Sequence, residues 1–374
     1  MKKTFQMAAV GAAAALLLAA CGEAPEETTT ATPGASDTSA APEATSKAVE
    51  GFKPCIVSDA GGFDDKSFNQ LSFEGLQTAA LEYGVEFGQV QSQSDSDFKT
   101  NLESLVSTDC TAIVSVGFAL SAATVESATA NPDINYILVD DAADNDFDGT
   151  KDAENIKPLL YDTAQAAFLA GYLSAGYSEA GKVGTYGGQP YPTVTIFMDG
   201  FKQGVEHYNE VNGTDVQVIG FEGGDKGVFT GGFENNQDAR NAADSIIEQG
   251  VDVILPVGGP IYQAALDSIA AAGRDIALIG ADADLYESDP KTQDVILTSI
   301  QKKMNASTYD AISSAATGEF DSEAYIGTLE NDGVGIAPLH NFEGKVDEAL
   351  LAEVEALKAD IISGEIKVKS YLQQ

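Results

Sequence analysis

Residues 54–83 read PCIVSDAGGFDDKSFNQLSFEGLQTAALEY, and this stretch sets the pattern that the rest of the chain repeats. An apolar run, Cys55–Ser58, leads into a loop rich in glycine and aspartate, and a helix-period segment follows over Phe68–Tyr83. A strand, a polar loop and an amphipathic helix in this order are typical of a parallel α/β sheet. The stretch therefore predicts the first unit of an α/β fold.

The same alternation recurs along the chain. Further strands are expected at Val85–Val90, Ala112–Val116, Tyr136–Val139, Val183–Tyr186, Val216–Phe221, Val251–Val257, Ile276–Ile279 and Val295–Thr298. Further helices are expected at Asn101–Ser107, Thr163–Tyr177, Phe197–Tyr208, Ala239–Glu248, Ile261–Ala272 and Met304–Ala316. The strand runs are nearly continuous and rich in β-branched residues, as in strands that helices cover on both faces. Because the alternation occurs once before and once after about residue 160, we expect two α/β lobes.

The first twenty residues have the features of a bacterial secretory signal. Lys2 and Lys3 precede an apolar stretch, Ala8–Ala20, that is too short to cross a bilayer as a mature helix. The ending Leu18-Ala-Ala-Cys21 resembles the lipobox of lipoproteins, in which the peptide is cut before the cysteine and the cysteine carries lipid such as palmitate. We therefore expect residues 1–20 to be a signal peptide, the alternative being an unprocessed membrane helix.

Residues 21–51 predict a disordered linker. They are rich in Glu, Thr, Ser, Ala and Pro, with Val49 as their one branched aliphatic residue. Such a segment cannot bury enough apolar surface to offset the entropy of ordering it. We expect it to act as a flexible tether that holds a soluble body, beginning near Phe52, at the extracytoplasmic face of the cell membrane.

The charge balance argues against nucleic acid as a partner. Acidic residues outnumber basic ones 58 to 20, which gives a formal net charge of −38. A field of this sign repels phosphate backbones and anionic lipid surfaces. The acidity also serves solubility, which is its simplest interpretation.

Two cysteines remain once Cys21 is assigned to lipid. Cys55 opens the first expected strand and Cys110 precedes the third. In a doubly wound sheet of order 2-1-3 these strands are neighbours, so both thiols would lie at the same edge in an oxidising compartment. We predict a Cys55–Cys110 disulfide, the alternative being two buried free thiols.

Polar, glycine and aromatic residues follow six of the expected strands. In open α/β sheets, ligands bind beyond the carboxyl ends of the strands, and glycine lets the backbone approach a ligand closely. The segments concerned are 59–70, Gly117-Phe118, Asp140-Asp141, Gly187-Gly188, Gly258-Gly259 and Gly280-Ala-Asp282. Six such loops at the same edge predict one cleft between the two lobes.

The side chains expected at this cleft favour an uncharged ring compound with hydroxyl groups. The set comprises the acids Asp59, Asp140 and Asp282, the amide of Asn69, the rings of Phe68, Phe118 and Phe197, and one cation, Lys302. A carboxylate repels phosphate but can accept hydrogen bonds from both hydroxyls of a ribose, and flat rings stack on a base. The alternatives are purely structural: Asp64 and Asp65 would cap the helix that begins near Ser67, and each phenylalanine would belong to the hydrophobic core.

No metal or cofactor is predicted. Asp144–Gly149 matches the first half of a calcium loop, but the twelfth position is Asn155 rather than glutamate, which favours a solvated acidic loop. The two histidines, His207 and His340, are far apart in the sequence, which gives little support for zinc or a Ser-His-Asp triad. No G-x-G-x-x-G follows a strand, so a dinucleotide is not indicated.

The loop 59–70, DAGGFDDKSFNQ, resembles the signature of the basic membrane lipoprotein family, the purine-nucleoside-binding components of ABC transporters. Further matches are Val116-Gly-Phe, Val139-Asp-Asp and 192–201, then 279–284 and Thr298-Ser-Ile-Gln-Lys302. The resemblance covers nearly all of residues 54–340. The chain departs from the family's commonest pattern at Gln189-Pro190-Tyr191, which leaves the base preference open.

The resemblance implies a type I periplasmic-binding fold with three crossovers between lobes. The N-terminal lobe would hold residues 52–160 and 291–320, and the C-terminal lobe 161–290 and 321–374. Phe68 and Phe197 would stack the base of inosine, adenosine or guanosine. The first lobe would contribute Asp59, Asn69 and Asp140, together with Asn101 and Phe118. The second would hold the ribose with Gly258, Asp282 and Lys302, and the closed protein would dock on an ABC permease.

The sequence fits three rival functions less well. A sugar-binding receptor of the same fold would place amides and arginines around the sugar, but Arg240 and Arg274 are the only arginines and neither belongs to the expected cleft. A nucleoside-processing enzyme would need a base–nucleophile pair, which the set lacks. A ligand-sensing regulator would need a DNA-binding segment before the first lobe, where this chain has a lipobox. We expect a binding protein and not an enzyme.

Overall fold

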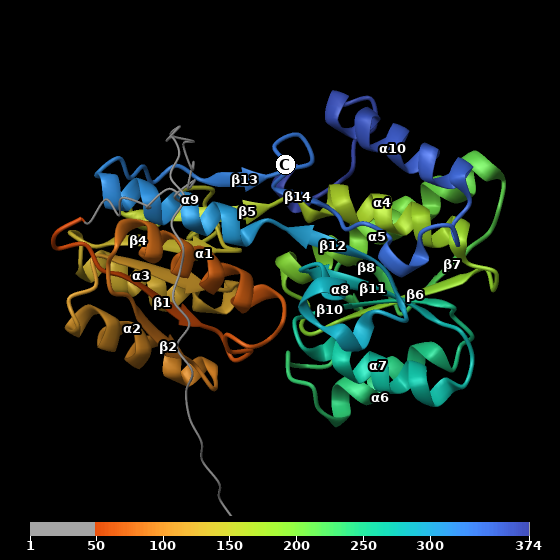
Figure 1. The fold of residues 1–374 in the computed structure, drawn as a ribbon, viewed down its shortest axis with the longest axis horizontal. Coiled ribbons are helices and arrows are strands. Elements are labelled where there is room, and N and C mark those ends of the chain that lie inside the picture. Colours follow the sequence, from red (N-terminus) through yellow and green to blue (C-terminus); the bar gives the residue numbers. More distant parts are fainter. Residues whose placement is uncertain (1–48, 374) are drawn as a thin grey trace, which may run out of the picture. The chain divides into compact units, whose positions relative to one another are not determined.

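The computed structural model describes residues 49–373, so the predicted signal peptide, the lipidation of Cys21 and nearly all of the linker lie outside the described residues. The described chain forms two six-stranded sheets with helices on both faces (Figure 1). The first sheet is entirely parallel, in the order β13-β5-β4-β3-β1-β2. Its strands are β1 (Pro54–Ser58), β2 (Gly88–Gln91), β3 (Ala112–Val116), β4 (Asn135–Val139), β5 (Ile156–Tyr161) and β13 (Tyr325–Gly327).

The second sheet has the order β14-β12-β11-β10-β6-β7. Its strands are β6 (Lys182–Gly187), β7 (Gln217–Ile219), β10 (Val253–Val257), β11 (Ala277–Asp282), β12 (Ile296–Lys302) and β14 (Val334–Ile336). All pair in parallel except the edge strand β14, which is antiparallel to β12. β8 (Phe221–Gly223) and β9 (Lys226–Gly227) form a separate two-stranded hairpin that packs against β6 and α5. The α/β class with two doubly wound sheets is confirmed, with this one antiparallel strand as a refinement.

Alternation along β1 shows why helices cover both faces of the first sheet. Ile56 packs in the core that includes Leu76 of α1 (Phe68–Tyr83), whereas its neighbours Cys55 and Val57 pack with Leu102 of α2 (Phe98–Ser107). Successive side chains of a strand point to opposite faces, so a fully apolar strand must be covered twice. Two further helices pack on this sheet, α3 (Ser121–Ala130) and α9 (Met304–Thr317).

The second sheet is covered in the same way. The helices concerned are α4 (Thr163–Tyr177), α5 (Pro192–Asn212), α6 (Gln237–Ile247), α7 (Ile261–Ala272) and the short α8 (Leu285–Ser288), and α10 (Glu348–Ser363) packs on the outside of α4. We call each sheet with its helices a lobe, the first and the second. Within residues 49–373, no helix combines the length and apolar character needed to span a bilayer.

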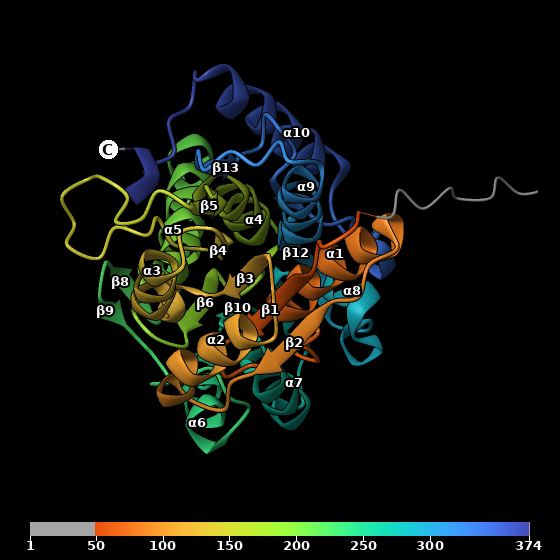
Figure 2. The same cartoon turned by 90° about the vertical axis from the view of Figure 1, so that its left-hand side faces the viewer.

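The chain crosses between the sheets three times, as the family resemblance implies. The crossings follow β5, β12 and β13. Figure 2 shows β12 of the second sheet leading into α9, which packs beside α1 of the first lobe. The crossing segments are bonded to one another, because Asp162 N donates to Gly327 O at 2.8 Å and Lys303 N donates to Gly333 O at 2.9 Å. Such cross-bonded segments are suited to act as a hinge.

Sheet membership differs from the expected lobe boundaries at two places. β12 lies in the second sheet, although 291–320 was assigned to the N-terminal lobe, and β13 lies in the first sheet, although 321–374 was assigned to the C-terminal lobe. The chain therefore changes sheets after Lys302 and again between Gly327 and Val334. The three-residue strands β13 and β14 carry too little periodicity to be recognised from the sequence, and the sheet that the recognised strand β12 joins is set by tertiary pairing.

The predicted disulfide is confirmed. Cys55 and Cys110 are bonded, with their Cα atoms 5.9 Å apart. The strand order β2-β1-β3 places both at the amino edge of the first sheet, as expected. A Cβ at Gly88 of β2 would come 2.7 Å from Cys55 Sγ, so this neighbouring position has no room for a side chain.

Candidate functional site

The carboxyl ends of the central strands of both sheets meet at one cavity. Its space measures about 590 Å³, open mouth included. The lining residues are Asp59, Gly61, Asp65, Phe68, Asn69, Gly117, Phe118, Ala119, Asp140, Tyr191, Thr193, Val194, Phe197, Phe233, Val257, Gly258, Gly259, Pro260, Asp282 and Lys302. Both lobes contribute, so closure around a ligand would bury it between them.

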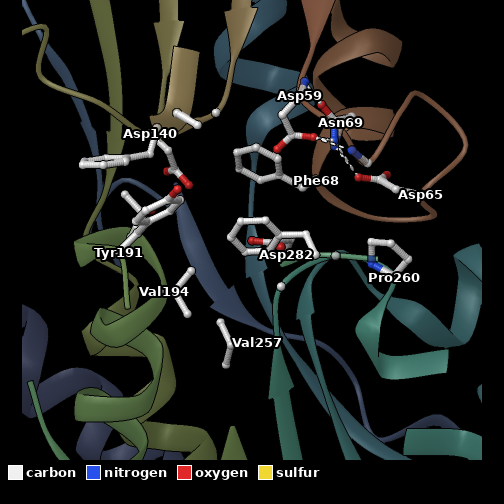
Figure 3. Close-up of a pocket in the computed structure, with 18 of the residues that line it drawn as sticks. Asp59, Asp65, Phe68, Asn69, Asp140, Tyr191, Val194, Val257, Pro260 and Asp282 are labelled. Carbon is white, nitrogen blue, oxygen red and sulfur yellow. Dashed lines mark hydrogen bonds between the residues drawn. The ribbon is translucent and has the colours of Figure 1, made fainter. Parts of the chain in front are cut away.

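Asp59, Asn69 and Asp65 form a hydrogen-bonded group on the first-lobe side of this cavity (Figure 3). Asn69 Nδ2 donates to Asp59 Oδ1 at 2.8 Å and to Asp65 Oδ2 at 3.0 Å. Asp59 Oδ1 also accepts from Gly61 N at 2.8 Å. These bonds hold the Asp59 carboxylate in one orientation at the end of β1, which is the preorganisation that a binding group needs.

Asp65 is mainly a helix cap. Its carboxylate accepts hydrogen bonds from the backbone amides of Ser67, Asn69 and Gln70 at 2.8–3.1 Å. Bonds of this kind satisfy the free amides at a helix start, here that of α1. The capping interpretation drawn from the sequence is therefore confirmed for Asp65. Asp64 is instead exposed and pairs with Lys66.

Lys302 is a buried cation between two carboxylates from different sheets. Its Nζ lies 2.5 Å from Asp140 Oδ2, at the end of β4, and 3.4 Å from Asp282 Oδ1, at the end of β11. The same Nζ lies 5.0 Å from the ring centroid of Phe197 and 5.1 Å from that of Phe68. An ammonium over aromatic faces is stabilised by their quadrupoles. The two rings proposed to stack a base therefore flank the one cation of the cavity lining.

Burial sets the protonation of these groups. It raises the pKa of Asp59 and of Asp282 to about 6, with the Lys302 ammonium opposing the rise at Asp282. The pKa of Asp140 is also raised, because burial outweighs its bond to Lys302. Burial alone would lower the pKa of Lys302, but Asp140 and Asp282 outweigh it and the pKa rises. The lysine is thus a fixed positive charge, while the carboxyls respond to mild acid.

Asp140 and Asp282 share an unusual backbone conformation. Their φ angles are 67° and 69°, in the left-handed region that side chains rarely adopt outside Asn, Asp and Gly. Each is the residue at which a strand ends or has just ended. Positive φ at functional positions is a form of local strain that the surrounding fold maintains, and here it directs both carboxyls to Lys302.

Nine of the ten predicted site residues line this cavity, namely Asp59, Phe68, Asn69, Phe118, Asp140, Phe197, Gly258, Asp282 and Lys302. Asn101 lies elsewhere, on α2, where its side-chain amide donates to Ser92 Oγ at 2.9 Å. Gly258 leaves space for the ring of Phe233, since a Cβ at position 258 would lie 2.9 Å from that ring. Whether these residues contact a ligand remains a prediction.

Two aromatic residues that the sequence did not place in the site, Tyr191 and Phe233, also line it. Tyr191 precedes α5, within the segment that departs from the family's pattern. That departure could have marked Tyr191 as a site residue from the sequence alone. Phe233 lies in the loop between β9 and α6, and no strand end precedes it closely enough to mark it.

The acidic loop after β4 gathers three carboxylates. Oxygens of Asp144, Asp146 and Asp152 lie within 4.8 Å of one another. Asp144 already accepts from Asp148 N at 3.1 Å and Gly149 N at 2.9 Å, and Asp152 accepts from Asn145 N at 2.7 Å. These carboxylates order their own loop, so we assign them no metal.

Known proteins resemble this chain in sequence and fold. The sequence model of the PnrA-like ABC transporter substrate-binding proteins (Bmp) matches residues 52–371. The ABC transporter nucleoside-binding protein BmpA of Lactococcus lactis subsp. cremoris is 28% identical over 336 residues, 85% of this chain and 89% of that protein. The CD4+ T-cell-stimulating antigen of Listeria monocytogenes is 28% identical over 339 residues, 86% of this chain and 89% of that one.

Among solved structures, an ABC transporter solute-binding protein from Aeropyrum pernix K1 matches with a TM-score of 0.73 and 25% identity, covering 84% of this chain and 92% of that one. The family match extends over both lobes and all three crossings. The family consists of transporter binding components and not of enzymes. This chain is a substrate-binding protein of an ABC transporter and belongs to the PnrA-like (Bmp) family.

Proposed function

We propose that the protein binds a nucleoside, with a purine as its base, between its two lobes. The observation that carries this proposal is the convergence of Asp59, Asp140 and Asp282 with Phe68 and Phe197 on one cavity. Buried carboxylates are strong acceptors for hydroxyl and amine donors, and flat rings suit a base. The similarity to a protein named for nucleoside binding supports the same ligand class.

The charge of the cavity favours a neutral ligand over a nucleotide. Lys302 is the one cation among the lining residues, and Asp140 and Asp282 already neutralise it. A phosphate placed here would face carboxylates without a free positive partner, which is costly at a buried site. The ribose diol, in contrast, offers two donors to a carboxylate such as Asp282.

We further propose that the protein is anchored by lipid on Cys21 at the extracytoplasmic face of the cell membrane. The signal-like residues 1–20 and the lipobox-like ending support this location. The closed form would deliver its nucleoside to the permease of the transporter. A ligand that touches both lobes favours the closed form by its higher affinity for that form.

Two measurements test the ligand. Native mass spectrometry of freshly purified protein should show a bound species with the mass of a nucleoside. Calorimetry with inosine, adenosine and guanosine should give saturable binding, whereas the corresponding 5′-monophosphates should bind far more weakly. Binding of hexoses with none of the nucleosides would reject the proposal in favour of a sugar receptor, and conversion of inosine to base and ribose would reveal an enzyme.

A further inference from the structure

Three aromatic rings stand in a row along the half-buried side of the cavity, and we call them the aromatic wall: Phe118, Tyr191 and Phe233. The ring centroids of Phe118 and Tyr191 are 5.0 Å apart with an interplanar angle of 31°, and those of Tyr191 and Phe233 are 5.9 Å apart. Phe118 follows β3 of the first sheet, whereas Tyr191 and Phe233 belong to the second lobe. The Phe118–Tyr191 contact therefore joins the two lobes.

The backbone holds Tyr191 in a fixed place. Pro190 and Pro192 flank it, and Pro192 is the first residue of α5. Tyr191 has φ −75° and ψ 148°, the extended conformation that a following proline imposes. Its carbonyl accepts from Val194 N and Thr195 N, both at 2.9 Å. A ring presented from such a restricted backbone loses little conformational entropy when it meets a partner.

The second lobe also supports Tyr191 from behind. Phe233 packs in the space left by Gly188, after β6, and Gly258, after β10. A Cβ would lie 2.4 Å from the Phe233 ring at position 188 and 2.9 Å from it at position 258. Two glycines at strand ends thus make room for an aromatic ring, and that ring in turn contacts Tyr191. Tyr191 and Phe233 thus belong to the same lobe, and Phe118 is the ring from the other lobe that Tyr191 contacts.

A second contact between the lobes lies next to a crossing. Lys302, bonded to Asp140, immediately precedes the segment that passes from β12 to α9. Figure 3 shows Tyr191 on the opposite side of the cavity from Asp59 and Asn69. Lys302 adjoins a crossing segment, whereas neither Phe118 nor Tyr191 belongs to one, so we expect lobe separation to affect the aromatic contact more than the ion pair.

We propose that Tyr191 is the gate residue of this cleft: its ring closes on Phe118 across the lobes and sets how long a bound ligand stays. This rests on the proposed function only in its choice of nucleoside as the probe. Offset aromatic pairs contribute enough beyond their buried area that losing one should speed release of the ligand about 2- to 10-fold. The association rate should change less, because most effects of contact residues appear in dissociation.

A double-mutant cycle with inosine tests the gate in the full chain. Tyr191→Ala and Phe118→Ala should each raise the dissociation rate measured by stopped flow, and the double variant should be no faster than the faster single one, because both remove the same contact. Tyr191→Phe keeps the ring and should retain the slow rate. Tyr286→Ala, which removes a stacked pair with His340 inside one lobe, serves as the matched control and should leave the rate unchanged.

A second measurement separates the gate from the choice of ligand. The chain contains no tryptophan, so Tyr191→Trp introduces a single reporter at the gate. Adding Phe118→Ala to this variant should move the emission to longer wavelength, because the indole loses its partner and gains solvent. The gate would be overturned if the effects of Tyr191→Ala and Phe118→Ala on the dissociation rate were additive. It would also be overturned if Phe118→Ala left the tryptophan emission of the Tyr191→Trp variant unchanged in both ligand-free and inosine-saturated protein. If no nucleoside binds, the emission shift alone still decides it.

Discussion

Lys302 and Asp140 form a buried ion pair whose two members come from different sheets. The lysine ends β12 of the second sheet, the aspartate follows β4 of the first, and the atoms Nζ and Oδ2 lie 2.5 Å apart. Asp282 joins them from the second sheet at 3.4 Å. The charge balance of the cleft therefore depends on both lobes together. The cavity combines this ion pair, close to a crossing, with an aromatic contact between Phe118 and Tyr191, which lie outside the crossing segments.

Removing the lysine charge should damage both stability and binding. Lys302→Met leaves the Asp140 and Asp282 carboxyls buried without a cation, and breaking one side of a buried pair costs about 3–5 kcal/mol. Urea unfolding should show this loss, and calorimetry should show little or no nucleoside binding. Lys303→Met is the matched control, because that lysine bonds Gln301 outside the cavity lining. Equal stability of the two variants would contradict the role given to Lys302.

Asp282→Ala should weaken nucleoside binding and leave the stability of the fold nearly unchanged. This carboxyl is buried and its pKa is raised to about 6, so its removal relieves a cost of burying charge and should not lower the free energy of unfolding by much. Nucleoside affinity should fall about 10- to 100-fold, as expected for the loss of charge-assisted bonds to ribose. Asp294→Ala, at an exposed position, should leave both quantities unchanged. Calorimetry that gives the parent affinity for Asp282→Ala would reject its assignment to the ligand.

Affinity and stability should respond to acid in opposite directions. Burial raises the pKa of Asp59 and Asp282 to about 6, so both lose their negative charge as the pH falls through that value, and a neutral carboxyl is a weaker acceptor. Nucleoside affinity should therefore decline from about pH 7.5 to about pH 5. Calorimetry across this range measures the decline, and an affinity that stays constant would exclude both carboxyls as ligand acceptors.

The linked effect on folding has the reverse sign. In the unfolded chain these aspartates titrate near their ordinary pKa, about 3.9, so the folded protein binds more protons between about pH 4 and pH 6. Their contribution to stability is fully present below the unfolded pKa and is lost as the pH rises through about 6. Urea unfolding of ligand-free protein should thus give a higher stability near pH 5 than near pH 7.5, and Asp282→Ala should reduce this difference.

Strong local patterns made most of the fold predictable. Each of the nine expected strands and seven expected helices overlaps an observed element, because buried parallel strands and their covering helices carry long apolar signals. The strand β5 was not recognised, since Lys157 and Pro158 interrupt its apolar run. Helix α3 was missed because its small residues, SAATVESATA, show little amphipathic contrast. The three-residue strands β13 and β14 depend on tertiary pairing that no local pattern marks.

The site was predictable where it follows strand ends and not where it depends on loops. Asp140 and Asp282 could be placed because a parallel sheet gathers the carboxyl ends of its strands at one edge. Asn101, carried over from the family resemblance, lies on α2 beside β2 and bonds Ser92 instead. Phe233 reaches the cavity from a loop, through space left by Gly188 and Gly258, and only the folded chain reveals that relation.

Removing the disulfide should weaken the fold without changing the site. Cys55 and Cys110 close a loop across 55 positions of sequence at the amino edge of the first sheet, whereas Asp59 lies beyond the carboxyl end of β1. Constraining the unfolded chain over such a loop is worth about 2–4 kcal/mol. Urea unfolding of a variant with Cys55→Ala and Cys110→Ala should show this loss, while calorimetry should give the parent nucleoside affinity. Reducing agent should reproduce the loss in the parent protein, and thiol titration of unreduced, denatured protein that finds both cysteines free would contradict the bond.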